Sequence, residues 1–350
     1  MKNSPAFVLL DVGASGSWCC GGTFTLTRGA QLSVRVGVGI ARGHHGELLQ
    51  GAFRQDSGEV RRGLTTLPCK LLATRATVRI EPFAGELMVI PHWKTKALRA
   101  ARIVTAALGH PHLAGTLRLR SNLQVGMGFG SSTSDVTAAI RAVLDAFSTK
   151  MATADIGRIA VESEGAADPL MFDDMVLFAH REGTVIESFG SSLPPVAVLG
   201  FPLGIGPVDT LEHPAAHYND DEIEQFGELL GKLRVGLLKK DFQKVAAVAT
   251  ESAQINQRFL PIPDFMSFRE VGEAARADGI QIAHSGNIGG LLFDPSDPDL
   301  QRKVLVANQE LSRLGVAKTW HYRDGSAAAV PDGQATLPAG ARSRADPVPR

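Results

Sequence analysis

One short stretch, GMGFGSSTSD, combines glycines and hydroxyl side chains in a pattern that suits phosphate binding. Gly126, Gly128 and Gly130 follow a strand-like segment and precede a helix-like one, so the backbone can turn tightly there. Backbone N–H groups at such a helix start form an anion site, and phosphate fits it well. Ser131 or Ser132 can add a hydroxyl ligand to Mg²⁺, as the hydroxyl of a P-loop does.

This loop differs from three familiar glycine-rich patterns. A GxxxxGK[ST] loop needs a lysine just before its hydroxyl residue, and this stretch has none. The third glycine of a GxGxxG dinucleotide loop would fall on Ser131. A GxSxG hydrolase elbow would need glycine in place of Ser134. A plain tight turn remains the alternative, although consecutive hydroxyl residues favour phosphate binding.

The elements that must position this loop alternate along the chain. Apolar and polar residues alternate as in half-buried strands at 33–41, 76–82 and 115–123. Helical spacing predicts helices at 95–108, 134–147, 151–163, 221–239, 241–257 and 264–277. Ser132 and Asp135 resemble a capping box before the helix at 134–147. Residues 280–323 read as strand, glycine loop, strand, helix and strand, and the whole predicts an α+β fold.

Composition favours a small-molecule partner over nucleic acid or membrane. Lysine plus arginine equal aspartate plus glutamate, 36 each, so the chain has no net field to attract a polyanion. Three cysteines cannot build a disulfide framework, and no CxxC or HExxH pattern offers a metal site. No signal peptide and no apolar run of about 20 residues is found, so a cytoplasmic protein is expected.

Five stretches, met in order, resemble the motifs of the GHMP kinases, the superfamily of galactokinase, homoserine kinase and mevalonate kinase. The glycine loop resembles the second motif, in the form typical of the L-threonine kinase branch associated with cobalamin side-chain assembly. The other stretches are GHHGELLQGAF (43–53), EGAADPLMF (164–172), NQRFLPIPDF (256–265) and AHSGNIGGLLFD (283–294). The resemblance spans roughly residues 35–315.

The resemblance implies two α+β lobes with ATP and substrate at their junction. Residues 35–190 would form a lobe like domain 2 of ribosomal protein S5, and residues 191–324 a ferredoxin-like lobe. Residues 1–34 would be an extension of uncertain structure. The composition of residues 325–350, rich in alanine, proline and glycine, is typical of a disordered tail. Members of the family are monomers or homodimers, and nothing in the sequence decides between them.

The resemblance also assigns roles in phosphoryl transfer. Asp168 would accept or orient the proton of the acceptor hydroxyl, and Ser132 would act beside it on the metal. Glu164 would hold Mg²⁺, with Glu162 as the rival residue. A capping or turn role is the alternative for Asp168, and solvated surface charge for the two glutamates. The residues expected to cradle the triphosphate of ATP are Gly126, Gly128, Gly130, Ser131, Ser132 and Thr133.

On the acceptor side, the resemblance points to the first motif, expected as a substrate-side loop at 43–53, and to the third motif, expected as a glycine loop at 283–294. A carboxylate and an amide suit an ammonium or hydroxyl group. The expected substrate residues are Glu47, Gln50, His45, His284, Ser285, Gly286 and Gly289, with His44 and Gly290 beside them. A structural role is the alternative for the histidines, and a plain hairpin turn for the glycines. Lys70 and Arg99 could pair with ATP or a substrate carboxylate, unless they are solvated surface charges.

Three positions depart from the family pattern. Gln124 replaces the usual proline, and Met127 and Ile262 replace lysines.

Taken together, the motifs predict an ATP- and Mg²⁺-dependent kinase that phosphorylates a hydroxyl of L-threonine or a related hydroxy amino acid. The missing lysines keep a kinase for another small alcohol in specialised metabolism open as an alternative. A second alternative is a nucleotide-binding pseudokinase that does not transfer phosphate.

Overall fold

The computed structural model of the chain describes residues 33–205, 216–283 and 287–324. The predicted tail and all but the last two residues of the predicted extension lie outside these ranges. In chain order the elements are β1 (Arg35–Arg54), β2 (Val60–Ala84), β3 (Leu87–Ile90), α1 (Thr95–Ala107), β4 (Leu113–Ser121), α2 (Ser131–Ala146), α3 (Thr153–Glu164), β5 (Val176–Ala179), β6 (Thr184–Ser188), β7 (Val196–Pro202), α4 (Asp220–Lys239), α5 (Phe242–Asn256), α6 (Phe265–Ala274), β8 (Gly279–Ile282), β9 (Ile288–Phe293), α7 (Leu300–Arg313) and β10 (Trp320–Asp324).

The strands form one sheet in the order β10-β7-β9-β8-β1-β2-β4-β3, and β5 pairs with β2 and with β6. Strands β1 and β2 make a long antiparallel hairpin, and β3 pairs parallel with β4. The sheet continues from β1 into β8 where Glu47 pairs with Ile282. Bulges interrupt β1 at Arg42/Gly43, His44/Glu47 and Glu47/Leu49, so the strand turns its side chains irregularly through this region.

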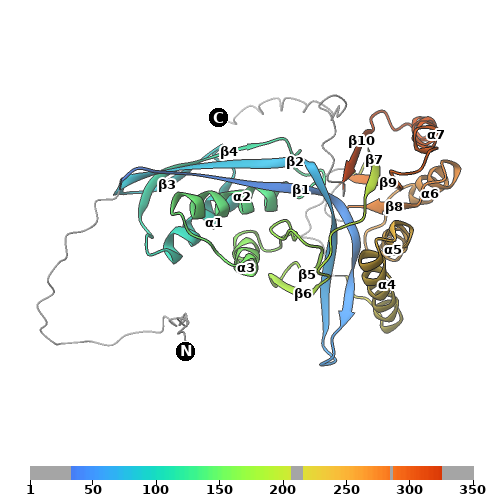
Figure 1. The fold of residues 1–350 in the computed structure, drawn as a ribbon, viewed down its shortest axis with the longest axis horizontal. Helices are drawn as coiled ribbons and strands as arrows, with labels where there is room; N and C mark the ends of the chain where they lie inside the picture. Colours follow the sequence, from blue (N-terminus) through green and yellow to red (C-terminus); the bar gives the residue numbers. More distant parts are fainter. Residues whose placement is uncertain (1–32, 206–215, 284–286, 325–350) are drawn as a thin grey trace, which may run out of the picture. The chain divides into compact units, whose positions relative to one another are not determined.

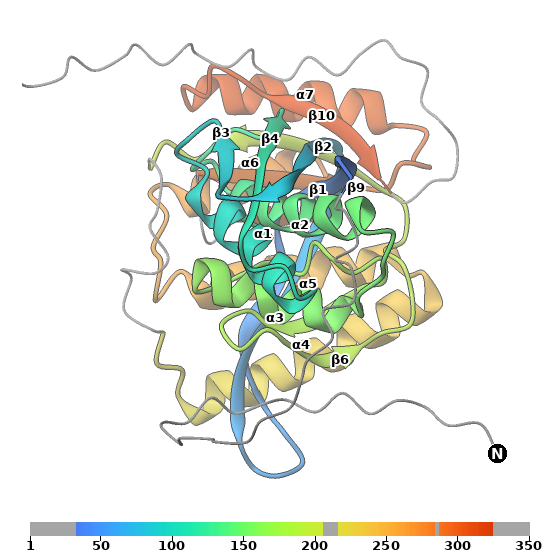
Figure 2. The same ribbon diagram turned by 90° about the vertical axis from the view of Figure 1, so that its left-hand side faces the viewer.

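The helices cover the sheet in groups. Helix α2 packs along β1 and β2 with α1 and α3 beside it, whereas α4 and α5 pack on the other half of the β1–β2 hairpin (Figure 1). Helices α6 and α7 lie by the strands from β7 to β10, and Figure 2 gives the same arrangement from the side. Among the helices of the described residues, none has both the length and the apolar character needed to cross a bilayer.

The apolar core is formed by side chains that the alternating and helical patterns place inward. One cluster joins the hairpin to α4, α5 and the C-terminal strands, and its largest members include Phe53, Phe226 and Trp320. A second cluster lies between α6, α7 and strands β7 to β9 and includes Phe201 and Phe268. The predicted lobe boundary at 190/191 falls between β6 and β7 and stays a prediction.

The α+β class and the predicted helices are confirmed, but two local expectations need correction. The first motif, expected as a loop, lies inside β1 because that strand runs on to Arg54. The capping box is wrong: Gly130, in a left-handed conformation, caps α2, and no side chain does. Asp135 instead accepts a hydrogen bond from Thr74 Oγ1 at 2.9 Å and forms an ion pair with Lys94.

Candidate active site

The glycine loop has the backbone that the sequence predicts. Gly126, Gly128 and Gly130 have φ angles of 76°, 94° and 70°, which side-chain-bearing residues rarely adopt. The hydrogen-bond ladder of α2 begins when the Ser134 N–H donates to the Gly130 carbonyl at 2.9 Å. The N–H groups before it precede that ladder and are the groups that an anion at a helix start would engage. A Cβ at residue 130 would lie 2.5 Å from His44 Cδ2, so glycine is also required by packing.

Thr133 ties two carboxylate-bearing segments to the start of α2. Its hydroxyl donates to Glu164 Oε1 at 2.8 Å and accepts the backbone N–H of Asp168 at 3.2 Å. The side chain is buried, at 3% exposure. Its hydroxyl therefore serves the architecture of the site, and the predicted contact of Thr133 with triphosphate is limited to its backbone N–H. Ser131 and Ser132, in contrast, are only partly buried.

Glu164 and Glu162 differ in their surroundings. Glu164 ends α3 and is buried at 5% exposure, whereas Glu162 is exposed on that helix. Burial, with the nearby charge of Asp168, raises the pKa of Glu164 to about 7, although hydrogen bonds from Ser132 and Thr133 favour its charged form. A buried carboxyl near neutrality, beside a serine hydroxyl at a helix start, fits a divalent cation that would draw off its proton. Glu164 is the better candidate for Mg²⁺.

Asp168 is paired with a buried histidine that the bulged β1 strand presents. His44 Nε2 lies 3.1 Å from Asp168 Oδ2, and the side chains are 0% and 19% exposed. Burial favours neutral His44, but Asp168 and Glu47 outweigh it and raise the pKa of the imidazole to about 9. Burial likewise opposes the charge of Asp168, and His44 nevertheless holds its pKa below the usual value. An imidazolium–carboxylate pair results, and such a carboxylate is a weak base.

Glu47 completes a cluster with this pair. One ligand atom each from His44, Glu47 and Asp168 lies within 4.8 Å of the others. The Glu47 carboxyl is buried at 4% exposure and adds a second negative charge beside the imidazolium. A cation or a hydrogen-bond donor placed here would meet two carboxylates. The described residues thus gather Glu47 and Asp168 although they are far apart in sequence.

Gln50 is held by its backbone and leaves its side-chain amide oxygen available. Its N–H donates to Ser252 Oγ at 3.0 Å, and its carbonyl accepts from Asn256 Nδ2 at 2.8 Å. Asn256, the first residue of the NQRF motif, also accepts from the Tyr218 hydroxyl at 2.7 Å. Among the described residues, no donor contacts the buried Oε1 of Gln50. The sequence did not single out Tyr218, and the NQRF motif was its one pointer to Asn256.

His45 occupies the core and corrects a sequence expectation. Its Nε2 accepts from Trp320 Nε1 at 2.9 Å, so its Nδ1–H donates to Gln281 Oε1 at 2.8 Å. The ring is 0% exposed and lies against Phe129, and burial lowers its pKa to about 4. With both nitrogens occupied and no accessible surface, His45 is a neutral structural residue that cannot contact substrate.

Only part of the third motif lies within the described residues. His284, Ser285 and Gly286 lie outside the described residues, so their predicted roles stay predictions. Gly289 and its neighbour Gly290 lie in β9, where a Cβ on Gly289 would approach the Phe201 ring to 3.0 Å. A side chain at 289 would thus crowd the packing between strands, and the predicted substrate contact of Gly289 stays a prediction.

The third motif also contacts the glycine loop. Asn287 donates its N–H to the Met127 carbonyl at 3.1 Å, joining the two motifs.

The two cations that the sequence offered for ATP or a substrate carboxylate were Lys70 and Arg99. Lys70 forms an ion pair with Asp324 at 2.7 Å. Arg99 is exposed on α1. Lys70 already has a carboxylate partner, and the structure adds nothing in favour of either cation.

A cavity of about 440 Å³ is lined in part by Gly43 and Pro169. These two residues are the sequence neighbours of His44 and Asp168. Its wall includes cationic Arg42 and Arg141 and the acidic Asp173. This volume lies in the range of small-molecule sites. The sequence did not predict this cavity, because its walls come from strands and loops that are distant along the chain.

Residues 95–180 match the family described as GHMP kinases N terminal domain. L-threonine kinase of Salmonella typhimurium is 23% identical over 282 residues, which cover 77% of this chain and 87% of that kinase. L-threonine kinase of Citrobacter freundii is 24% identical over 194 residues, covering 54% of this chain and 66% of that kinase. Homoserine kinase from Cytophaga hutchinsonii superposes with a TM-score of 0.58 at 16% identity, covering 86% of this chain and 97% of that structure.

Proposed function

We propose that this chain, which belongs to the GHMP kinases and is a phosphotransferase, acts on a hydroxy amino acid. It would transfer the γ-phosphoryl group of ATP to a hydroxyl of L-threonine or a related hydroxy amino acid. One observation carries the proposal. Thr133, in the first turn of α2, bonds both Glu164 and the backbone of Asp168. The cation-side and acceptor-side carboxylates are thereby tied to the phosphate end of one helix, which is the arrangement that phosphoryl transfer needs.

The glycine loop and the first turn of α2 would hold the triphosphate. Positive φ angles at the three loop glycines allow the tight turn that an anion site at a helix start needs. Mg²⁺, when bound, neutralises charge on the transferring group. Ser132 and Glu164 would hold that ion, because the buried carboxyl of Glu164 gives up its proton near pH 7.

Asp168 would orient the acceptor hydroxyl rather than act as a strong base. The imidazolium of His44 lowers the pKa of Asp168, so the carboxylate is ionised and accepts a hydrogen bond from the hydroxyl. As the acceptor oxygen forms its bond to the γ-phosphorus, the bond to the ADP oxygen breaks, and late in the transfer the acidified hydroxyl proton passes to the Asp168 carboxylate and from there to solvent. Placement in line supplies most of the rate under this view.

An amino-acid acceptor suits the charges beside Asp168. Glu47 adds a buried carboxylate and Gln50 a buried amide oxygen, and both accept hydrogen bonds from an ammonium group. The likeness to two L-threonine kinases supports the same class of acceptor. We extend the proposal to a cytoplasmic protein that binds ATP and this small metabolite, as a monomer or homodimer, without nucleic acid or membrane.

The missing lysines support a second candidate, a kinase for another small alcohol. Ile262 is 6% exposed and packs in the cluster with Phe265 and Phe268, so position 262 presents no cation. Met127 packs against the other core cluster. An acceptor without a carboxylate needs neither lysine, which is the specific reason to keep this candidate.

ADP release with ATP and Mg²⁺, measured across hydroxy amino acids and small alcohols, tests both candidates. L-threonine or a close relative is expected to give turnover that Ser132→Ala and Asp168→Asn each reduce at least 100-fold. Asp56→Asn and Ser57→Ala, exposed changes of the same kind, serve as matched controls and should leave the rate unchanged. Turnover with a simple alcohol alone would favour the second candidate. ATP binding without turnover on any acceptor would refute both and indicate a pseudokinase.

A further inference from the structure

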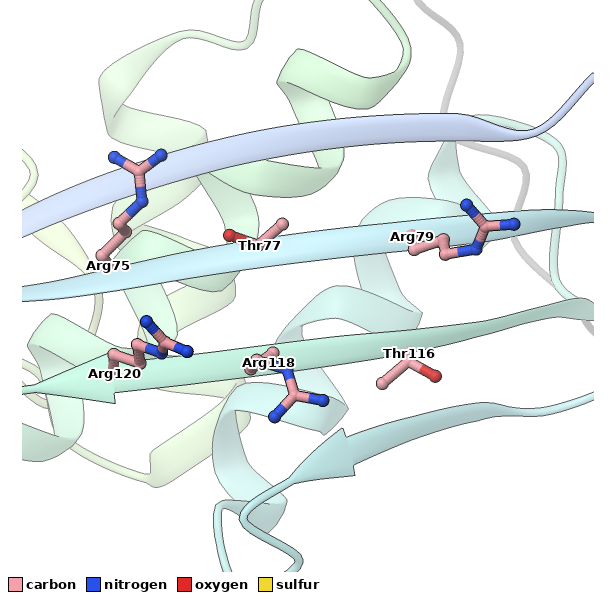
Figure 3. A pocket seen from close by; sticks show the side chains of 6 residues that line it. All are labelled: Arg75, Thr77, Arg79, Thr116, Arg118 and Arg120. Atoms are coloured by element: carbon pink, nitrogen blue, oxygen red, sulfur yellow. The ribbon is translucent and has the colours of Figure 1, made fainter.

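Four arginines stand together on the open face of the sheet, opposite the face that α2 covers. Arg75 and Arg79 come from β2 with Thr77 between them, and Arg118 and Arg120 come from β4, where Thr116 lies opposite Arg79 (Figure 3). They line a hollow of about 460 Å³, and all four arginines are exposed. None of these residues belongs to a GHMP-like motif or to the candidate active site.

The register of the two strands brings like charges directly together. Arg75 pairs with Arg120, and Thr77 pairs with Arg118. Like charges directly opposite in an antiparallel pair destabilise a sheet. Arg79 has a partner, since its Nε lies 2.8 Å from Glu81 Oε1. Within residues 33–205, 216–283 and 287–324, the other three arginines form no ion pair with a carboxylate.

We propose that this hollow binds a small anion that carries two or more phosphate groups, at a site separate from the active site. Guanidinium groups grip phosphate oxygens in bidentate fashion, and each phosphate carries up to about two negative charges. Three uncompensated guanidiniums therefore match a diphosphate or triphosphate in charge. The threonine hydroxyls at 77 and 116 add donors at the floor of the hollow.

The size of the cluster favours a small ligand over a macromolecule. At about 3.3 Å per residue and about 4.8 Å between strands, the four Cα positions span only about 13 Å by 5 Å. The chain as a whole has balanced charge, so it lacks the broad basic surface that nucleic acid or an anionic membrane requires. A second copy of the same face would bring arginine against arginine and is disfavoured by charge.

Apolar residues flank the arginines on both sides. On β1, Ile40 pairs with Arg75 and is 48% exposed. On β3, Ile90 pairs with Arg118 and is 40% exposed. These side chains give the organic part of a phosphorylated ligand an apolar surface to lie against. The site would thus accept an organic polyphosphate, with the phosphates over β2 and β4.

Calorimetric titration of the full chain with inorganic tripolyphosphate at low salt tests the proposal. Wild type is expected to bind one equivalent at the arginines in addition to any bound at the glycine loop, and Arg118→Gln/Arg120→Gln should lose this equivalent or bind it at least tenfold more weakly. The double variant Arg302→Gln/Arg313→Gln removes the same charge from exposed positions on α7 and should bind as wild type does. Because the stoichiometry counts the equivalents, binding at the glycine loop is recorded separately.

Thermal melting adds a readout that a simple structural role would not give. Arg120→Gln relieves the repulsion with Arg75, so it should raise the melting temperature without ligand and reduce the rise that tripolyphosphate causes in wild type. Unchanged affinity and stoichiometry in Arg118→Gln/Arg120→Gln would overturn the proposal. Equal loss in the α7 control would also do so, as would arginine-dependent binding of duplex DNA or phosphatidylglycerol vesicles in place of tripolyphosphate.

Discussion

The imidazolium–carboxylate pair of His44 and Asp168 should make the stability of this protein fall as pH rises from about 6.5 to 9. The pKa of His44 rises from 6.5 to about 9 on folding, because Asp168 and Glu47 outweigh the effect of burial. At 1.36 kcal/mol per unit, this corresponds to about 3 kcal/mol of folding free energy. A raised pKa contributes fully below the unfolded value and is lost as pH passes the folded value. The whole contribution is therefore present below pH 6.5 and absent above about pH 9.

Asp168→Asn should reverse the sign of this dependence. Without the carboxylate, burial of the ring dominates, and the pKa of His44 drops below 6.5. Stability then rises with pH up to 6.5 and stays level above it. His180, near Asp168, has a pKa of about 4 in the folded state and does not titrate between pH 6.5 and 9.

Urea unfolding at pH 6, 7.5 and 9 measures the effect as the difference between wild type and Asp168→Asn, which cancels groups common to both. His112→Gln changes an exposed histidine and should keep the wild-type dependence. His44→Gln provides a second variant, expected to lose the fall between pH 6.5 and 9. If wild type and Asp168→Asn give parallel free energies across this range, His44 is not an imidazolium in the folded protein and the reasoning fails.

Three further predictions concern single side chains. Glu164→Gln should raise the Mg²⁺ concentration for half-maximal ADP release at least tenfold. The wild-type protein should also need more Mg²⁺ below pH 7, where the Glu164 carboxyl is protonated. Equal Mg²⁺ requirements of variant and wild type would contradict a role of Glu164 in holding the ion. Gly130→Ala should cost about 2 kcal/mol or more in urea unfolding, since φ is 70° and the Cβ would strike His44. His45→Gln should destabilise by about 1–3 kcal/mol with KM unchanged, because its nitrogens bond Trp320 and Gln281; a raised KM would restore it to the substrate site.

The sequence predicts a functional feature where all the residues that form it lie in one contiguous segment. The alternating glycines and the following hydroxyls predict a phosphate loop, and Gly126, Gly128 and Gly130 do have positive φ angles before α2. Helical periodicity predicts α4 and α5 because apolar spacing along one segment does not depend on distant residues. The order of strand-like and helix-like segments predicts the α+β fold, and the resemblance of five short stretches indicates the kinase family, because each of these patterns lies within a local segment.

The tertiary structure alone decided which of these residues meet. His44 and Asp168 are 124 residues apart and come together because a bulged β1 and the turn after α3 converge on the start of α2. One residue of register separates His44, beside Asp168, from His45, bonded to Trp320 in the core. Strand register likewise sets Arg75 against Arg120. Such pairings arise from hydrogen bonds between distant strands, and a one-residue slip would reverse the face of each side chain, so no local pattern encodes them.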